Sequence, residues 1–336
     1  MSIHIPDVTE QADYLELSAA HRETLDKALK QFQTENDPAS NWEDAGEKEG
    51  VKLYRKTNPE NAYDVPTVKG ETIVENATPF QVFSVVQIPG FRKRWDGRFD
   101  FGESLERYGP QSFMFYSVMK SPSYFVWARD IVGLQENLIN NDGDEIIIVQ
   151  TSTSADQYVS EDASYSKSRT RATLEVSAWK LTKEGSNTKV EYVVKVHLNG
   201  SIPTSVVSMI ATETPMCVGS VRDTFYTYGH APHEILASGQ QRNKTSMLHA
   251  KYEDGDGTDA TSGAKKWTGY YIGEGSDSFQ IKYDNKRLYA SGVNVSIEGP
   301  DSSVAKASDD AEAGLITIEV TEESKGKRFE IVLTPK

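Results

Sequence analysis

Residues 171–178 read RATLEVSA and residues 190–198 read VEYVVKVHL, and these two stretches decide the fold of the N-terminal part of the chain. In the first stretch, apolar residues occupy every second position from 172 to 178. In the second, apolar or aromatic residues occupy every second position from 190 to 198. Because such alternation is typical of strands with one buried face, we predict two strands of a sheet.

A helix is expected to follow these strands, from Pro203 to about Tyr228. Pro215 interrupts its pattern by removing one backbone donor, and Gly219 loosens the next turn. The interruption is either the hinge of a movable helix or an ordinary kink in a packing helix, and the sequence leaves both readings open. The apolar side of this helix comprises Val206, Val207, Met209, Ile210, Val218, Val221 and Phe225.

The residues before the two strands predict another helix, several strands and a short second helix. Apolar residues at helical spacing run from Tyr14 to Phe32, and the turn residues that begin at Asn36 end the pattern. Thr78 as an N-cap with Pro79 in the first helical position predicts the short helix, and a loop rich in arginine and aromatic residues follows it. Extended segments are expected at 50–56, 67–74, 112–119, 126–136 and 145–152.

Together these elements predict an α+β domain, in which an antiparallel sheet of about half a dozen strands lies between an early helix and a long terminal helix. A strongly curved sheet around one helix leaves room for either a packed core or a cavity. Hydrophobic periodicity does not distinguish the two.

The chain of 336 residues is long enough for two domains. Residues 237–264 are rich in Ser, Gly, Asp and Thr, and we expect them to form a polar, acidic linker between a domain at 1–236 and a domain at 265–336. The second domain alternates apolar and polar residues in short runs separated by turn residues, which predicts a small β-sandwich.

The formal net charge of −14 bears on the partners of the protein. Nucleic-acid binders concentrate Lys and Arg, so we expect no nucleic-acid partner. The segment 237–336 has 13 basic and 16 acidic residues, so most of the negative charge lies in the first domain. This charge disfavours permanent residence on anionic lipid and leaves transient membrane contact open.

Cys217 is the single cysteine, so the chain forms no internal disulfide and suits a reducing compartment. The first ten residues lack the pattern of a secretory signal, and no run of 18 apolar residues occurs. We therefore expect a cytoplasmic location. The six histidines show no metal-ligand spacing, and we expect neither a metal nor a cofactor.

Four motifs in the first domain resemble the START domain, the lipid-binding family named after steroidogenic acute regulatory protein. Trp42 precedes the 50–56 strand as in the opening of that family, and Arg94-Trp95-Asp96 is similar to its Trp-Asp loop. Residues 127–132, WARDIV, resemble its Arg-Asp strand, and residues 199–203, NGSIP, resemble the start of its C-terminal helix. The resemblance covers residues 14–236, and no family resembles the C-terminal domain.

The resemblance implies a helix-grip fold, in which a curved antiparallel sheet surrounds a tunnel closed by the C-terminal helix. It implies non-catalytic binding and transfer of one lipid, which could be a phospholipid, a fatty acyl chain or a sterol-like molecule. The tunnel and lid residues expected to contact this ligand are Tyr116, Val118, Arg129, Gln135, Val176, Val194, Val206, Met209, Ile210, Val218, Val221 and Phe225.

Sterol-carrying members of the family pair an acidic residue with an arginine inside the tunnel. The corresponding positions here hold Tyr116 and Gln135, so the charged pair is absent. A tyrosine hydroxyl and an amide can hydrogen-bond a neutral or zwitterionic group, or they can merely cap a packed core. The polar segment 155–169 is expected to be a loop at the tunnel mouth.

Two other functions remain open. The same cavity could serve a hydrolase or cyclase acting on a lipid-like substrate, although the sequence shows no nucleophile with a nearby base. Cys217 lies on the apolar-rich helix, where a small buried hydrophobe is the simpler interpretation. Alternatively, the first domain could have a filled core while the β-domain binds a protein partner.

Overall fold

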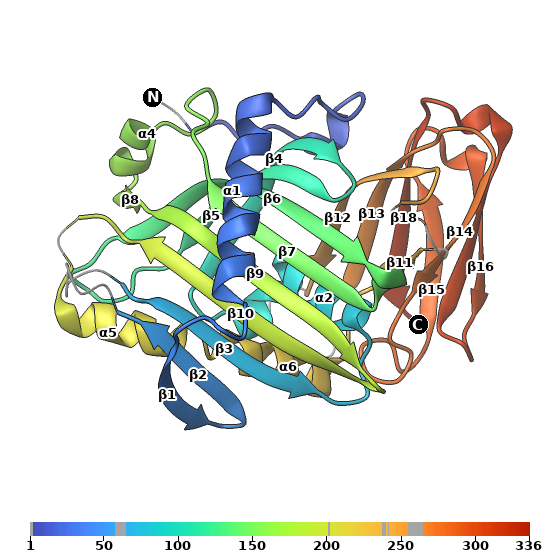
Figure 1. Ribbon diagram of the computed structural model, residues 1–336. Coiled ribbons are helices and arrows are strands. Elements are labelled where there is room, and N and C mark those ends of the chain that lie inside the picture. The colour runs from blue at the N-terminus through green and yellow to red at the C-terminus, as the bar shows by residue number, and fades with distance from the viewer. Residues whose placement is uncertain (1–2, 58–64, 201, 237–239, 241, 255–264) are drawn as a thin grey trace.

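The computed structural model describes residues 3–57, 65–200, 202–236, 240, 242–254 and 265–336 (Figure 1). Its largest element is a curved ten-stranded sheet, which confirms the α+β prediction. Nine strands follow the order β1-β2-β3-β10-β9-β7-β6-β5-β4, and β8 pairs in parallel with β6. The strands are β1 Glu43–Lys48, β2 Val51–Lys56, β3 Thr67–Val74, β4 Phe99–Gly109, β5 Ser112–Met119, β6 Ala128–Asn140, β7 Glu145–Ser152, β8 Arg169–Arg171, β9 Thr173–Glu184 and β10 Asn187–His197.

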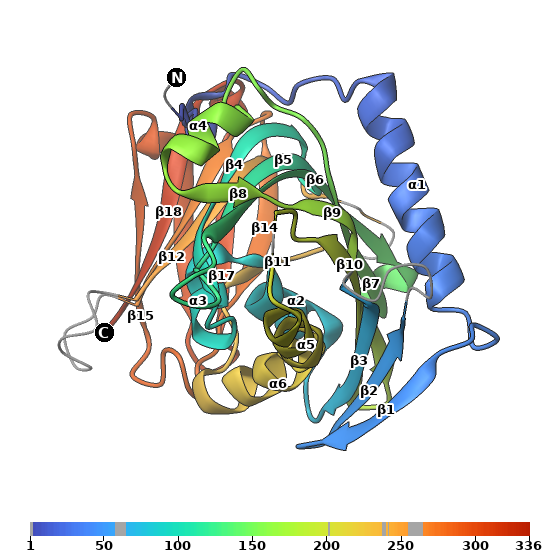
Figure 2. The same ribbon diagram turned by 90° about the vertical axis from the view of Figure 1, so that its left-hand side faces the viewer.

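Helix α1, Ala19–Glu35, covers the outer, convex face of this sheet (Figures 1 and 2). Ser18 caps its first turn, so the helix begins five residues later than the apolar spacing from Tyr14 predicted. Leu25, Ala28 and Phe32 are buried against outward-facing residues of β5, β6, β7 and β9. This packing fills the convex side of the sheet and leaves the concave side for the remaining helices.

The concave face holds the other main helices (Figure 2): α2 Pro79–Gln87, α3 Pro89–Trp95, α5 Thr204–Glu213 and α6 Cys217–Tyr228. The predicted capping at Thr78 is present, since its hydroxyl accepts from Gln81 N and the Gln81 side chain accepts from Thr78 N. Helix α3 and strand β4 occupy the region expected to be a loop. Basic residues obscure the apolar pattern of α3, and three register shifts break the alternation of β4.

The expected single helix from Pro203 to Tyr228 is two helices, separated at residues 214–216. Pro215 lies in this break, and its carbonyl oxygen would be 2.1 Å from a Cβ atom at Gly70 of β3. The close approach requires glycine at position 70 and holds the break against the sheet. The segment 155–169, expected to be a loop, contains α4 Glu161–Ser166, and β8 begins at its end.

The C-terminal part forms two four-stranded antiparallel sheets, in the orders β11-β14-β17-β16 and β12-β13-β18-β15, consistent with the predicted β-sandwich. Their strands are β11 His233–Ile235, β12 Ser246–Glu253, β13 Lys266–Ile272, β14 Asp277–Lys282, β15 Val293–Glu298, β16 Ala305–Asp310, β17 Leu315–Val320 and β18 Arg328–Pro335. Short 3-10 turns lie at Val8–Glu10, Asn141–Gly143, Ser302–Val304 and Glu322–Ser324.

The division at 237–264 remains a prediction, but part of the expected linker is a strand. β12 lies inside this range and pairs with β13, while β11 lies before it and pairs with β14. Residues 237–239, 241 and 255–264 of the expected linker lie outside the described residues. The composition of the segment hid β12, because its alternating apolar positions are interrupted by a register shift between Met247 and His249.

The two parts of the chain pack directly against each other. Arg94 of α3 pairs with Asp254 and donates to the Tyr252 hydroxyl at 3.2 Å, and its guanidinium lies 4.1 Å from the centre of the Tyr228 ring. Phe91 meets the Tyr252 ring edge-on at 5.0 Å. β12 therefore rests on α3 of the first domain.

Among the described residues, no helix is both long and apolar enough to cross a membrane.

Candidate functional site

A cavity of about 690 Å³ lies between the concave face of the sheet, α3, α5, α6 and β12. This volume is within the range of natural sites that enclose small organic ligands. The sheet contributes inward-facing side chains from β5, β6, β7, β9 and β10, as strand alternation requires. The structure thus resolves the alternatives that periodicity left open, in favour of a cavity.

One part of the cavity wall is aromatic. Trp179 of β9 stacks on Tyr192 of β10 at 4.1 Å between ring centres, and Trp95 of α3 meets Trp179 edge-on at 5.5 Å. The Trp95 indole donates to the Val85 carbonyl at 2.9 Å. Since this buried N–H has its partner, the rings present apolar faces and edges to the cavity at no cost of an unpaired polar group.

A polar row crosses the sheet on the cavity side. The register places Phe113 opposite Gln135, Gln135 opposite Gln150, and Gln150 opposite Ser177. Gln150 donates to Gln135 Oε1 at 2.7 Å, and the Ser177 hydroxyl lies 3.2 Å from both Gln150 Oε1 and the Tyr192 hydroxyl. The row offers neutral hydrogen-bonding groups in the middle of an otherwise apolar wall.

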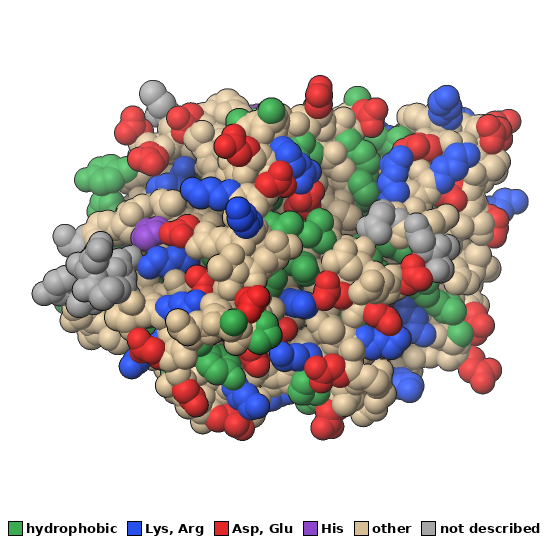
Figure 3. All heavy atoms as spheres, viewed as in Figure 1, with side chains coloured by type: hydrophobic (Ala, Val, Ile, Leu, Met, Phe, Trp, Pro, Cys, Tyr) green, Lys and Arg blue, Asp and Glu red, His purple; other side chains and the backbone are tan. Residues whose placement is uncertain are grey.

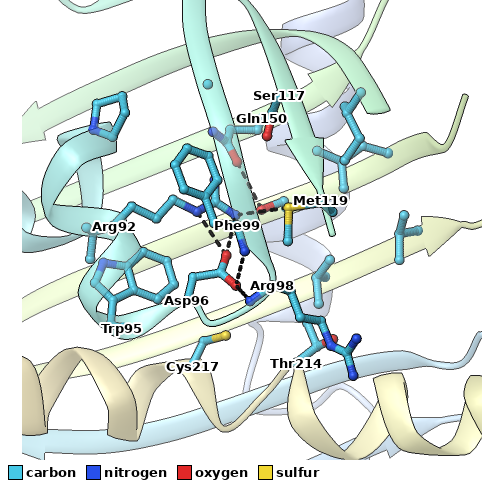
Figure 4. Close-up of a pocket in the computed structure, with 18 of the residues that line it drawn as sticks. Arg92, Trp95, Asp96, Arg98, Phe99, Ser117, Met119, Gln150, Thr214 and Cys217 are labelled. Atoms are coloured by element: carbon cyan, nitrogen blue, oxygen red, sulfur yellow. Dashed lines mark hydrogen bonds and ion pairs between the residues drawn. The ribbon is translucent and has the colours of Figure 1, made fainter. Parts of the chain in front are cut away.

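A charged pair lies where α3 meets the cavity (Figure 4). Arg92 donates to Asp96 Oδ2 through Nε at 3.0 Å and through Nη2 at 2.7 Å, and the backbone N–H groups of Arg98 and Phe99 donate to Asp96 Oδ1. The Arg92 guanidinium lies 4.6 Å from the centre of the Phe99 ring. The charges of Arg92 and Asp96 compensate each other, so the pair can lie at the cavity wall without an unpaired buried charge.

The C-terminal domain completes the cavity. Met247, His249 and Ala250 of β12 belong to its wall, although they lie in the range expected to be a linker. His249 Nε2 lies 3.9 Å from Glu103 Oε2 of β4. Burial lowers the pKa of His249 to about 3, with Arg107 and Lys251 acting in the same direction, so its ring is neutral at physiological pH.

Helix α5 covers the cavity through a small apolar cluster and through an ion pair, in which Arg98 donates to Glu213 at the end of the helix through Nε at 2.8 Å and also through Nη2. Its buried residues Val206 and Ile210 pack with Val126 in a small cluster, beside Leu198, Ile202 and Met209. Helix α6, in contrast, is anchored to the sheet, because Arg222 donates to the carbonyl oxygen of Glu49 at 2.9 Å and to the hydroxyl of Thr72 at 3.1 Å. α6 is therefore held by the large core and by hydrogen bonds to the sheet, whereas α5 is held by a smaller cluster and an ion pair.

The sequence-predicted site residues separate into three groups. Arg129, Gln135, Val194, Val206 and Ile210 border the cavity. Val218, Val221 and Phe225 of α6 lie instead in the large hydrophobic core, and Met209 packs beside Val126. Val118 and Val176 point to the convex face under α1. Ligand binding by these residues remains a prediction, and for those outside the cavity the placement speaks against it.

Tyr116 borders the cavity, but its side chain lies on the convex side of the sheet. Its ring belongs to the cluster under α1, and its hydroxyl donates to Asp130 Oδ2 at 3.1 Å and accepts from Arg169 Nη1 at 2.8 Å. Burial raises the pKa of Tyr116 to about 12. Tyr116 and Gln135 therefore face opposite sides of the sheet. Tyr116 pairs with Val132 on β6, and Val132 and Gln135 are an odd number of residues apart, so their side chains point to opposite faces.

Arg129 is committed to the backbone. Its guanidinium donates to the carbonyl oxygens of Leu198 and Asn199 at 2.9 Å each, and also to that of Trp127. This arginine ties strand β6 to the segment that leads into α5. The residue borders the cavity, and its hydrogen bonds hold the segment that precedes α5, while ligand binding by Arg129 remains a prediction.

Sequence reasoning missed Arg92, Asp96, Arg107, Gln150 and Ser177, all of which line the cavity. The spacing of Arg92 and Asp96, four residues apart, was a visible signal for an ion pair on a helix. The other three needed the register of the strands, which no local pattern supplies.

Cys217 also lines the cavity. Burial raises the pKa of its thiol to about 12, so the thiol stays protonated at neutral pH. Among the described residues, no three His, Cys, Asp or Glu side chains come close enough to hold a metal ion.

A family model and two solved structures with a similar fold show what this chain resembles. Residues 23–222 match the family described as the START domain. The fold is similar to human StAR-related lipid transfer protein 5, with a TM-score of 0.53 and 18% identity over 61% of this chain and 95% of that one. It is also similar to human STARD10, with a TM-score of 0.52 and 17% identity over 66% of this chain and 85% of that one. No curated protein matches the chain.

Proposed function

Because the chain belongs to the START domain family, we propose that it binds one lipid in its internal cavity and transfers it between membranes without a chemical step. The observation that carries this proposal is the cavity of about 690 Å³, with its aromatic wall and its neutral polar row. The similar human protein is itself named a lipid transfer protein.

The energetics of such a site favour a carrier. Burying one methylene group is worth about 0.8 kcal/mol, so an acyl chain of about sixteen carbons gains roughly 10 kcal/mol on leaving water. A bilayer offers a similar gain. The lipid can therefore exchange between the protein and a membrane without a large net change in free energy.

We propose that α5 alone is the movable lid, with Pro215 at its hinge. The small cluster of Val126, Val206 and Ile210 and the ion pair of Arg98 with Glu213 hold α5, whereas α6 is fixed to the sheet through Arg222 and packs in the large core. Removing α5 would expose Val206 and Ile210 together with the cavity they cover. A helix that is lightly packed on one side opens at lower free energy than the core elements do.

A membrane surface suits the region beside this lid. Tyr124 and Phe125, in the segment between β5 and β6, are 95% and 89% exposed, and Trp127 stacks edge-on with exposed Tyr165 of α4 at 5.2 Å. Figure 3 shows hydrophobic side chains protruding at the left edge, near the position of α4 in Figure 1. Aromatic side chains of this kind insert at the membrane interface, while the net charge of −14 favours release from anionic lipid.

The test of the proposed function uses the full chain. Native mass spectrometry after incubation with a mixed lipid extract should show one lipid per protein, and the protein should accelerate lipid movement between donor and acceptor vesicles. If the purified chain retains no lipid and moves none, the carrier proposal is wrong. A lipid that is bound but chemically altered would instead support a cavity enzyme.

A cysteine pair tests the lid. In a chain with Cys217→Ser, the substitutions Val126→Cys and Ile210→Cys join the two sides of the small cluster. Oxidation should stop transfer and reduction should restore it, while each single-cysteine variant should be insensitive to oxidant. Unchanged transfer by fully cross-linked protein would contradict gating by α5.

A cytoplasmic location and a protein partner for the β-domain remain predictions. The packing of β12 against the cavity supports a different use for part of that domain, as a wall of the lipid site.

A further inference from the structure

Arg107 of β4 is a buried cation in the cavity wall. The residue is 5% exposed, and it lies directly across from Phe113 of β5, whose own neighbour is Gln135 of the polar row. The N-terminal segment holds its backbone in place, since Arg107 N donates to Gln11 Oε1 and Arg107 O accepts from Leu15 N. These hydrogen bonds fix the backbone of β4 at Arg107.

The Arg107 guanidinium has few interaction partners. Nη2 donates to the Pro110 carbonyl at 2.9 Å, the group lies 4.8 Å from the centre of the Phe113 ring, and Nε is buried without a hydrogen-bond partner. Throughout the part of the chain that the structure describes, no carboxylate lies within ion-pair distance of it. A buried charge without a counter-ion is costly, and most buried arginines are paired.

The neighbours of Arg107 do not neutralise it. Tyr14 donates its hydroxyl to the Met247 carbonyl at 3.2 Å, and His249 is neutral. Glu103 is near His249 rather than Arg107, and burial raises the pKa of its carboxyl. Burial lowers the pKa of Arg107 to about 10, so the side chain still carries its charge at neutral pH.

We propose that Arg107 binds an anionic group of the lipid, a carboxylate or a phosphate, so that the ligand of this cavity is an acidic lipid. The inference rests on the proposed lipid-binding function and names the class of lipid. A planar guanidinium binds either group through two parallel hydrogen bonds, and its charge makes those bonds strong in a dry site. The head group would lie at the end of the cavity closed by β12, with the chain along the aromatic wall.

The wild-type chain provides the first measurement, which needs no variant. Its affinities for hexadecanoic acid, for hexadecyl phosphate and for hexadecanol are compared at pH 7.5 by titration or native mass spectrometry. One or both anions should bind about tenfold or more tighter than the alcohol with the same chain. Preference for only one anion identifies the carboxylate or the phosphate.

Arg107→Met then removes the charge while keeping much of the side-chain volume. This variant should bind the alcohol as before and lose the preference for the anions, and Arg107→Lys should retain part of that preference. Arg55→Met, an exposed arginine on β2, is the control with the same change in net charge. It should bind as the wild type does.

The outcomes separate this inference from the function on which it rests. Equal affinity of the wild-type chain for all three lipids, or the same anion preference in Arg107→Met, would overturn the role of Arg107 while leaving lipid binding intact. Binding of none of these lipids, nor of any component of a mixed extract, would overturn the proposed function itself.

Discussion

Gly90 of α3 lies so close to Tyr252 of β12 that a Cβ atom at position 90 would be 1.7 Å from the Tyr252 carbonyl oxygen. This contact joins the two parts of the chain at the cavity, since β12 supplies Met247, His249 and Ala250 to its wall. The packing of the C-terminal domain against α3 therefore requires glycine at position 90.

Gly90→Ala should lower the free energy of unfolding by about 2 kcal/mol or more, because one backbone segment must move away from the other. Urea denaturation measures the change. Gly109→Ala is the matched control, because no atom lies within 4 Å of a Cβ at that position. Similar stability of the two variants would show that the domains are loosely joined at this contact.

Filling the cavity should block lipid binding without unfolding the protein. Ser117 of β5 lines the cavity near Met119 (Figure 4), and Ser117→Trp would occupy space that is otherwise available to ligand. We expect lipid uptake to fall about tenfold while the thermal midpoint stays close to that of the wild type. Ser186→Trp, in the exposed turn between β9 and β10, controls for the added indole. Undiminished uptake by Ser117→Trp would place the lipid elsewhere.

The exposed aromatic side chains beside α5 should set the rate of transfer. Replacing Tyr124 and Phe125 by serine should slow lipid movement between vesicles several-fold, because the side chains that insert into the interface are lost. Lipid affinity in solution should be unchanged. Leu15→Ser with Ile73→Ser removes two exposed apolar side chains at other sites. Transfer that slows equally in both double variants would show that the loss of any exposed apolar side chains slows it, and not the loss of Tyr124 and Phe125 in particular.

Acid should destabilise the protein through His249. The pKa of this histidine is about 3 in the fold, chiefly because it is buried, and about 6.5 in an unfolded chain. The unfolded chain therefore binds a proton below about pH 6.5 while the fold does not. The stability that depends on the neutral ring is complete above that pH and is lost as the pH falls toward 3.

Between pH 7.5 and pH 5, His249 should account for a loss of about 2 kcal/mol in the free energy of unfolding. Other groups that face or surround it, Glu103, Arg107, Lys251, Asp7 and Tyr270, contribute a background that His249→Gln retains. Urea denaturation at both pH values should therefore show a weaker pH dependence in His249→Gln than in the exposed control His4→Gln. An equal dependence would refute the assignment to His249.

Much of the fold could be predicted from local pattern. Strands β3, β5 and β7 have the predicted bounds, and Thr78 caps α2 as expected, with Pro79 in its first turn. β4 and β12 were missed because register shifts break the alternation that identifies a strand. Local pattern succeeds where one strand face is uniformly buried, and it fails where bulges rotate side chains to the other face.

The candidate site could be predicted only in part. The motifs that resemble the START domain indicated a cavity and Gln135 within it, but they also suggested Tyr116, Val118 and Val176, whose side chains lie under α1. A shift of one residue along a strand exchanges the two faces of a sheet. The face that each residue presents thus depends on the pairing of whole strands, and a short motif does not specify it.

By itself, the sequence determined the α+β class and the break at Pro215, because these depend on local periodicity and on the missing N–H of proline. The family and the curved sheet around a helix came from the resemblance of four short motifs to the START domain. Only the tertiary structure decided that α6 packs in the large core while α5 packs through a small cluster, that β12 lines the cavity, and that no carboxylate among the described residues lies within ion-pair distance of Arg107. Those features arise from strand register and from contacts between residues more than a hundred positions apart, as with Gly90 and Tyr252.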